Sequence, residues 1–190
     1  MHPTLSQAVW PQTETNKWLR SAALVFVGVA ALWISAKVQV PFWPVPVTMQ
    51  TLIVLLIGMA YGPKLGVSTI LAYLAAGAAS LPVFAGTPEK GIGILYMVGT
   101  TGGYLVGFVV AAAVVGWMAA KGWTKSVVMV VAAMIIGNLV IYAFGFSWLS
   151  TFIGAEKAWI FGVKPFIWGD LLKIGLAAMI LPGLWAMIRK

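Results

Sequence analysis

Residues 102–120 read GGYLVGFVVAAAVVGWMAA, a run that contains no charged side chain. A continuous apolar run of roughly 18 or more residues is long enough to cross the hydrocarbon core of a bilayer as a helix. The rest of the chain has the same character, because 62% of the 190 residues are hydrophobic and only 8% are charged. An average soluble domain carries about 25% charged residues. Lipid is therefore the expected solvent for most of this chain.

Proline, glycine and charged residues divide the rest of the chain into further apolar segments. Prolines 41, 44 and 46 end one segment and Gly62-Pro63 ends the next, because proline removes a helical hydrogen-bond donor. The sequence thus predicts an all-α polytopic bundle in a single integral membrane domain, residues 1–190, with no soluble domain. Six transmembrane helices are expected, at about residues 20–38, 48–61, 64–80, 102–120, 127–146 and 170–188.

The basic residues lie mostly at the ends of the apolar segments and predict the orientation of the chain. Seven of the 12 Lys and Arg residues fall on the side of the two termini and five on the other side, which carries three of the four acids. An excess of Lys and Arg is typical of cytoplasmic loops. Residues 1–19 contain Glu14 and two prolines, unlike the basic start of a cleaved signal peptide, and are expected to form a cytoplasmic tail. Both termini are then cytoplasmic.

The composition excludes several classes of function. Cys is absent and His2 is the only histidine, so neither a thiol nucleophile nor a metal site is expected. Four acids and one histidine supply no general acid/base set, so the chain is not expected to be an enzyme. The net charge of +8 forms no basic run that would indicate nucleic-acid binding. No GxxxxGK[ST] loop occurs, so the chain cannot use ATP by itself.

Three connections on one side of the membrane carry the unusual composition. In a six-helix chain the first, third and fifth connections face the outer side, and here they cover residues 41–48, 81–101 and 146–169. Long loops that contain aromatic residues are more often functional than decorative. The outer mouth of the bundle is therefore the predicted site.

Asp170 and Lys173 are the most informative polar residues. A spacing of three places both on one face of an apolar helix, and charges inside a membrane are costly and usually functional. The structural alternative is that Asp170 caps the helix and Lys173 is its salt-bridge partner. Gln50, expected on the first turn of the second helix, is the next candidate, and a helix-to-helix hydrogen bond is its structural alternative.

Aromatic and small residues provide two further patterns. Five aromatic residues are expected to form either an apolar pocket wall or an aromatic belt at the membrane interface. They are Trp43, Phe84, Tyr96, Tyr104 and Trp168. Gly103 and Gly107 form a GxxxG pattern that predicts packing within the bundle. A stripe of small residues on the first helix predicts packing against a partner helix or, alternatively, inside the bundle; it comprises Ser21, Gly28, Ala31 and Ser35.

Four stretches, in chain order, resemble BioY, the biotin-binding S component of energy-coupling-factor (ECF) transporters. They are VPVTMQTL at 45–52, the stretch 73–86 that ends in LPVFAG, TGGYLVGF at 101–108, and the pair PF and GDLLK within 165–173. Each stretch is short, but together they span the chain from the end of the first expected helix to the sixth.

The resemblance implies a six-helix fold in a prokaryotic cell membrane, with biotin as the transported ligand beneath the outer loops and no cofactor. It implies polar ligands at Gln50, Asp170 and Lys173, and a pocket wall made by Phe84, Tyr104 and the turn Gly102-Gly103. The implied partners are a transmembrane T component, docked on the first helix, and cytoplasmic ABC-type ATPases.

Two positions depart from the family pattern. Thr100 replaces a proline, and the AxxxA motif of the first helix is reduced to Ala31 with Ser35. The outer loops contain no arginine, which leaves Lys90 or Lys173 as the partner of the biotin carboxylate. The rival function is a self-sufficient secondary carrier or facilitator for a small vitamin-like solute, in which Asp170 would be the buried carboxylate.

Overall fold

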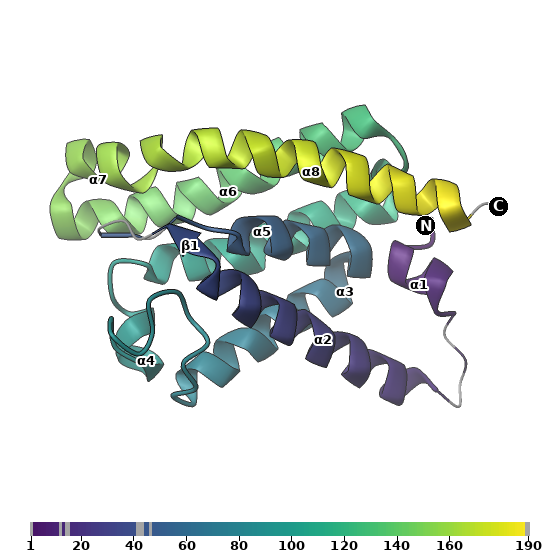
Figure 1. Cartoon of the computed structure of the whole chain (residues 1–190), viewed down its shortest axis with the longest axis horizontal. Coiled ribbons are helices and arrows are strands. Elements are labelled where there is room, and N and C mark those ends of the chain that lie inside the picture. Colours follow the sequence, from purple (N-terminus) through teal and green to yellow (C-terminus); the bar gives the residue numbers. More distant parts are fainter. Residues whose placement is uncertain (1, 12, 14–15, 41–43, 46, 189–190) are drawn as a thin grey trace.

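The computed structural model describes residues 2–11, 13, 16–40, 44–45 and 47–188. It is a helical bundle with one short antiparallel ribbon (Figure 1). The helices are α1 (Leu5–Val9), α2 (Lys17–Lys37), α3 (Gln50–Ala78), α4 (Gly93–Met97), α5 (Gly102–Ala120), α6 (Val127–Ile153), α7 (Ala155–Gly162) and α8 (Lys164–Ile188). The ribbon pairs β1 (Gln39–Val40) with β2 (Val47–Thr48), and a 3-10 turn, Trp123–Lys125, precedes α6.

Helix α3 consists of two antiparallel arms. Gly62 has a φ of +81°, in the left-handed region that favours glycine, and the following Pro63 cannot donate to the preceding turn. The arms fold back on each other, because a Cβ on Gly66 would lie 3.1 Å from the Cα of Gly58. Eight residues along a straight helix would separate these positions by about 12 Å. The second and third expected helices are thus a hairpin.

Because α3 is a hairpin, the number of helices that cross the bundle agrees with the predicted number. Among the described residues, five helical stretches are long and apolar enough to cross a membrane, and α3 is one of them. Because α3 reverses at Gly62, the described chain supplies six helices across the bundle. The expected all-α membrane fold is confirmed.

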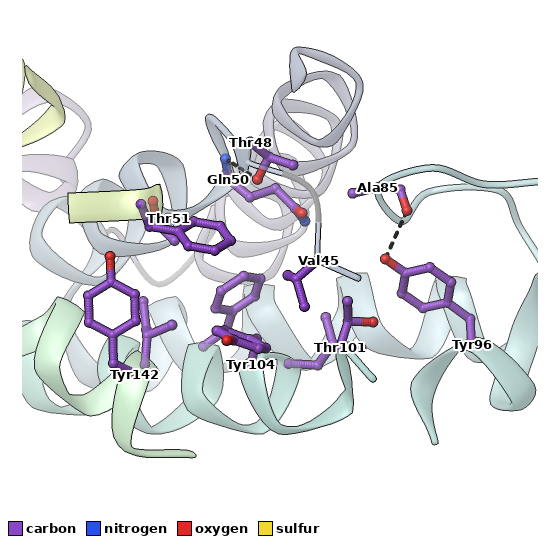
Figure 2. A pocket seen from close by; sticks show the side chains of 13 residues that line it. Val45, Thr48, Gln50, Thr51, Ala85, Tyr96, Thr101, Tyr104 and Tyr142 are labelled. Carbon is purple, nitrogen blue, oxygen red and sulfur yellow. Dashed lines mark hydrogen bonds between the residues drawn. The ribbon is translucent and has the colours of Figure 1, made fainter. Parts of the chain in front are cut away.

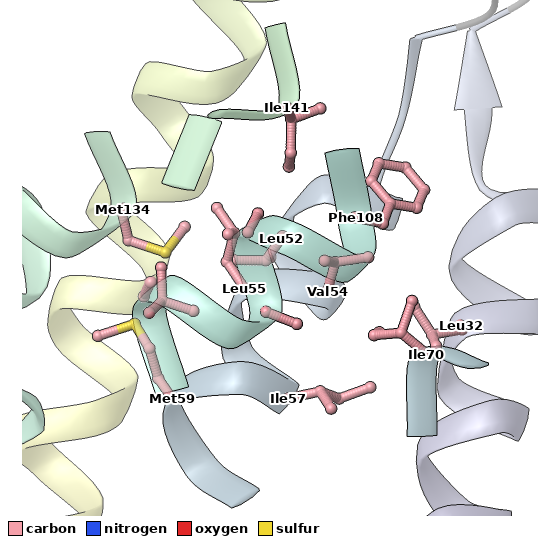
Figure 3. Close-up of a cluster of buried hydrophobic side chains, with 14 of the residues drawn as sticks. Leu32, Leu52, Val54, Leu55, Ile57, Met59, Ile70, Phe108, Met134 and Ile141 are labelled. Carbon is pink, nitrogen blue, oxygen red and sulfur yellow. The ribbon is translucent and has the colours of Figure 1, made fainter. Parts of the chain in front are cut away.

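Helix α5 lies between α3 and α6 and is packed closely against both. A Cβ on Gly58 would come within 2.6 Å of Val115, and one on Gly116 within 2.7 Å of Pro63, so glycine permits these approaches. Buried side chains from α3, α5 and α6 fill the centre, among them Leu55, Phe108, Met134 and Ile141 (Figure 3). Many large apolar side chains remain exposed on the outside, as expected for a surface that faces lipid.

The molecule has two distinct ends. In Figure 1, α1 and the last turns of α8 lie at one end, whereas α4, α7 and β1 lie at the other. The buried Arg20 guanidinium fixes α1, because it donates to the carbonyl groups of Ser6 (2.7 Å) and Trp10 (2.6 Å). The backbone N–H of His2 donates to the carbonyl of Ala120 at 2.9 Å. Part of the expected N-terminal tail is therefore a folded segment.

Several predicted boundaries were wrong. Helix α2 begins at Lys17 instead of residue 20, α6 continues to Ile153 instead of 146, and α8 begins at Lys164 instead of residue 170. Most of the expected loop 146–169 is helical, because only Gly154, with a φ of +81°, and Val163 lie outside α6, α7 and α8 in this stretch. Pro165 lies in the first turn of α8, where a backbone N–H would have no hydrogen-bond partner within the helix, so proline is tolerated there. The expected loop 81–101 likewise contains α4.

Candidate ligand-binding site

A pocket lies between the hairpin α3, α5 and α6 near the end of the bundle that carries α4 and α7 (Figure 2). It encloses about 470 Å³ of empty space, its open mouth included. Its walls are mostly apolar and aromatic, with a few polar groups, as is typical of small-molecule sites. The aromatic wall consists of Tyr96, Tyr104, Phe108, Tyr142 and Phe166, and the polar groups are Thr48, Gln50, Thr51 and Thr101.

Gln50, Tyr96 and Tyr104, three of the residues proposed from the sequence, line this pocket. Gln50 is the first residue of α3, and its amide Nε2 donates to the hydroxyl of Tyr73 at 2.7 Å. That hydroxyl in turn donates to the carbonyl of Val83 at 2.8 Å. The helix-to-helix bond expected as the alternative is therefore present as well, and it holds the amide at the pocket wall.

A buried charged cluster lies beside the pocket. The Lys173 ammonium is 2.9 Å from Oδ1 of Asp170, and it also donates to the hydroxyl of Thr51 at 2.8 Å. The hydroxyl of Tyr142 donates to the second carboxylate oxygen, Oδ2, of Asp170. Side chains from α3, α6 and α8 thus meet at one ion pair.

The ion pair forms a second layer behind the pocket wall. Among the described residues, the pocket is lined by Thr51 and Tyr142, which bond to the pair, and not by Asp170 or Lys173 themselves. Asp170 is the seventh residue of α8, well inside the helix, so the alternative that it caps the helix is wrong. The two hydroxyls therefore connect the pocket wall to the charges behind it.

Phe84 also lies behind the wall instead of in it. Its ring stacks on Tyr96, with ring centroids 4.8 Å apart, and meets Tyr73 edge-on at 5.4 Å. Gly77 makes room for it, because a Cβ there would come within 2.0 Å of the Phe84 ring. Tyr96 donates to the carbonyl of Ala85 at 2.8 Å (Figure 2), and burial raises the pKa of Tyr96, which keeps the phenol protonated.

The structure assigns Gly102 and Gly103 to helix packing and not to the pocket wall. A Cβ on Gly103 would lie 2.2 Å from the Cβ of Trp148, and one on Gly102 would lie 2.2 Å from the carbonyl oxygen of Met97. The Trp148 indole N–H donates to the carbonyl of Gly99 at 2.8 Å. These glycines allow α6 to approach the start of α5, so the expectation for them was wrong.

Two of the four residues in the small-residue stripe of α2 face inward. Gly28 and Ser35 are buried, and a Cβ on Gly28 would lie 2.5 Å from the Thr69 side chain in α3. Ser21 and Ala31 are partly buried. At Gly28 the close packing expected of this stripe is made with the chain's own α3, as in the internal alternative. Packing of the stripe against a partner helix stays a prediction.

The two tryptophans proposed for the wall have different outcomes. Trp168 is 77% exposed, which fits the belt alternative. Trp43 lies outside the described residues.

The main residues that the sequence analysis missed are Thr51 and Tyr142. Each is a single hydroxyl-bearing residue among apolar neighbours. Such a residue is a weak signal in a membrane helix, because hydroxyl groups there often form hydrogen bonds within the bundle. Thr51 is next to Gln50, and Tyr142 is the one tyrosine of the expected helix 127–146. Their significance depends on the meeting of α3, α6 and α8, which no local pattern indicates.

Comparisons with known proteins show which family the chain resembles. The model of the BioY family matches residues 6–190. The probable biotin transporter BioY of Pyrococcus horikoshii is 38% identical over 161 residues, which cover 85% of this chain and 93% of that protein. The biotin transporter BioY of Thermotoga maritima is 40% identical over 152 residues, covering 80% and 87%. A crystal structure of the S-component for biotin from an ECF-type ABC transporter has a similar fold, with a TM-score of 0.78, 23% identity, and coverage of 92% of this chain and 95% of that one.

Proposed function

Since the chain belongs to the BioY family, we propose that it is the substrate-binding membrane subunit of a biotin uptake transporter. It is a transport protein and not an enzyme. The observation that carries the proposal is the buried Asp170–Lys173 pair beside an aromatic pocket. Charges inside a membrane are expensive and mark substrate sites.

Biotin has the chemistry that this site recognises. Its ureido ring offers two N–H donors and one carbonyl acceptor. Asp170 accepts the N–H donors, and the Lys173 ammonium, which has three N–H groups and uses two of them on Thr51 and Asp170, donates to the carbonyl. Gln50 adds a neutral polar contact at the wall. In a low-dielectric site such charge-assisted bonds are strong.

The shape of the pocket suits an elongated ligand. Figure 2 shows Tyr142 and Tyr96 at opposite ends with Tyr104 between them. We place the ureido ring at the Tyr142 end, next to the charged cluster, and the aliphatic chain along Tyr104 towards Tyr96. Lys90 is our candidate for the partner of the biotin carboxylate, because it lies close to the pocket wall. The Lys90 stem packs against Gly86, where a Cβ would lie 2.8 Å from it, beside the lining residue Ala85.

Uptake against a gradient needs partners. The chain contains no nucleotide-binding loop, so we propose a transmembrane T component and cytoplasmic ABC-type ATPases as the energising module. The face of α2 that remains exposed is our candidate contact for the T component; it carries Phe26, Val27 and Ile34. In the orientation that we propose, α1 and the end of α8 lie on the cytoplasmic side of the membrane, and the pocket opens to the outside.

Two measurements test the proposal. Purified protein is expected to bind biotin saturably and to bind analogues without the ureido ring much more weakly, because these leave Asp170 without N–H donors. Vesicles that contain this chain alone are expected to accumulate no biotin, even with an imposed proton gradient, whereas vesicles that also contain the energising module accumulate it with ATP. Equal binding of the analogues would contradict the role of the charged pair, and gradient-driven accumulation by the chain alone would favour a self-sufficient carrier.

A further inference from the structure

Residues 83–87, the wall segment, lie between α3 and α4 and form part of the pocket. Ala85 lines the pocket, and its carbonyl accepts a hydrogen bond from the hydroxyl of Tyr96 at 2.8 Å (Figure 2). The carbonyl of Val83 accepts one from the hydroxyl of Tyr73 at 2.8 Å. Phenol groups from α4 and α3 therefore hold two carbonyl groups of the wall segment by neutral hydrogen bonds.

Lys37, the last residue of α2, holds the remainder of the wall segment. Its ammonium group donates to the carbonyls of Phe84 (3.2 Å) and Thr87 (2.8 Å) and to the hydroxyl of Thr87 (3.0 Å). A lysine has three N–H donors, so these bonds use all of them. The acceptors belong to buried residues, 1% and 5% exposed, whereas Lys37 itself is exposed. Bonds to a charged group are stronger than the neutral bonds of Tyr73 and Tyr96.

The ordinary role of a lysine in the last turn of a helix does not explain this geometry. Such a side chain usually interacts with the carbonyl end of its own helix. The Lys37 ammonium instead bonds to residues that follow it by 47 and 50 positions in the chain. Because the wall segment lies outside the helices and strands, its buried carbonyl groups need side-chain donors. Lys37 thus connects the end of α2 to the pocket wall.

We propose that Lys37 is a positioning residue for the ligand. It keeps the wall segment against the pocket, so that Ala85 and Tyr96 stay in contact with a bound biotin molecule. Among the described residues, Lys37 is not one of those that line the pocket, so it acts through Phe84 and Thr87. This inference rests on the proposed function and adds a residue to that site. Because the ammonium holds a wall that is already closed, it slows escape of the ligand more than it assists capture.

The test compares Lys37→Met with the wild type in detergent, because methionine keeps a flexible side chain but removes all three donors. Three quantities are measured: the melting temperature of ligand-free protein, the rate constants for biotin association and dissociation, and hydrogen exchange of the backbone amides in residues 81–92. The melting temperature should stay close to that of the wild type, because position 37 is exposed. The dissociation rate constant should rise about 10-fold, which corresponds to about 1.4 kcal/mol, and the association rate constant should change less than about threefold. Exchange should become faster in residues 81–92 and stay unchanged in α5.

Three companion variants separate the ammonium group from other effects. Lys37→Arg retains the charge and N–H donors and should recover part of the slow dissociation. Thr87→Val removes the hydroxyl acceptor and should also speed dissociation; combined with Lys37→Met it should add less than its separate effect, because both changes break one contact. Lys17→Met, the same change at the exposed first residue of α2, should leave all three quantities unchanged.

Several results would overturn the inference. Wild-type dissociation and exchange in Lys37→Met would show that the ammonium group does not hold the wall. An equal rise in dissociation for Lys17→Met, or faster exchange throughout α5, would assign the effect to general loosening of the bundle. Fully additive effects of Lys37→Met and Thr87→Val would show that Lys37 does not act through this contact. Failure of the wild-type chain to bind biotin would instead contradict the proposed function, and exchange in residues 81–92 would still test the contact that Lys37 makes.

Discussion

The Lys173 ammonium and the Asp170 carboxylate form a buried ion pair within α8, with Nζ 2.9 Å from Oδ1 and the two side chains 5% and 6% exposed. Thr51 from α3 and Tyr142 from α6 each bond to the pair. Two charges are thus held in the bundle by hydrogen bonds from two other helices. An ion pair that is already satisfied in this way can exchange one of its bonds for a ligand without leaving a charge unpaired.

Asp170→Ala is expected to weaken biotin binding by about 1.5 to 3 kcal/mol, because a hydrogen bond to a charged group is lost. Gln50→Ala should cost less, about 0.5 to 1.5 kcal/mol, because that contact is neutral. Equilibrium titration of detergent-purified variants measures both, with the exposed Glu156→Ala as the control. Unchanged affinity in a folded Asp170→Ala protein would remove the carboxylate from the ligand site.

Lys173→Met is expected to lower the free energy of unfolding by about 3 to 5 kcal/mol, because it leaves Asp170 as an uncompensated buried charge. The double variant Asp170→Leu/Lys173→Met should regain most of that loss, since it removes both charges, but it should not regain biotin binding. Denaturant unfolding in detergent and ligand titration check the two parts. A double variant that binds biotin normally would show that the pair is structural.

Tyr142→Phe is expected to weaken biotin binding by about 1.5 to 3 kcal/mol, because its hydroxyl bonds to the Asp170 carboxylate and lines the pocket. Tyr61→Phe is the matched control, since Tyr61 lies elsewhere on α3 and makes no side-chain hydrogen bond among the described residues. Equal losses in the two variants would indicate a general effect on the bundle instead of a role for Tyr142.

Single cysteines test the orientation, because the natural chain has none. A cysteine at Glu89 or Glu156, both exposed near the pocket end, should react with a membrane-impermeant reagent added to intact cells. A cysteine at Lys121, which is exposed at the opposite end, should react only after the membrane is opened. The reverse pattern would place the pocket on the cytoplasmic side and contradict uptake.

The sequence predicted the helices wherever a long apolar run was decisive. The run 102–120 is the observed α5, and Gly62-Pro63 marks the turn of the α3 hairpin. It failed where a charged or glycine-containing stretch was interpreted as a loop. Residues 155–162 form α7 because, between Gly154 and Val163, neighbouring residues favour helix and pack against α6 and α8.

Part of the site was also predictable. Asp170 and Lys173 stand out because charges in an apolar helix are rare. Gln50, Tyr96 and Tyr104 were candidates because they lie in or next to the loops that the sequence predicts at the outer mouth. Small residues carried less information, since a glycine that admits a ligand and a glycine that admits a neighbouring helix have the same sequence signal. Gly103 faces Trp148 and Gly28 faces Thr69, and only the packing of the helices decides between the two roles.

The central claim is that the pocket beside Asp170 and Lys173 binds biotin. A titration of biotin into the purified wild-type chain, alongside Asp170→Ala and the Asp170→Leu/Lys173→Met double variant, tests it most directly. We predict saturable binding at one site per wild-type chain and a loss of affinity in both variants whose fold is verified by thermal melting. Absence of saturable binding by folded wild-type protein, or wild-type affinity in the double variant, would contradict the claim.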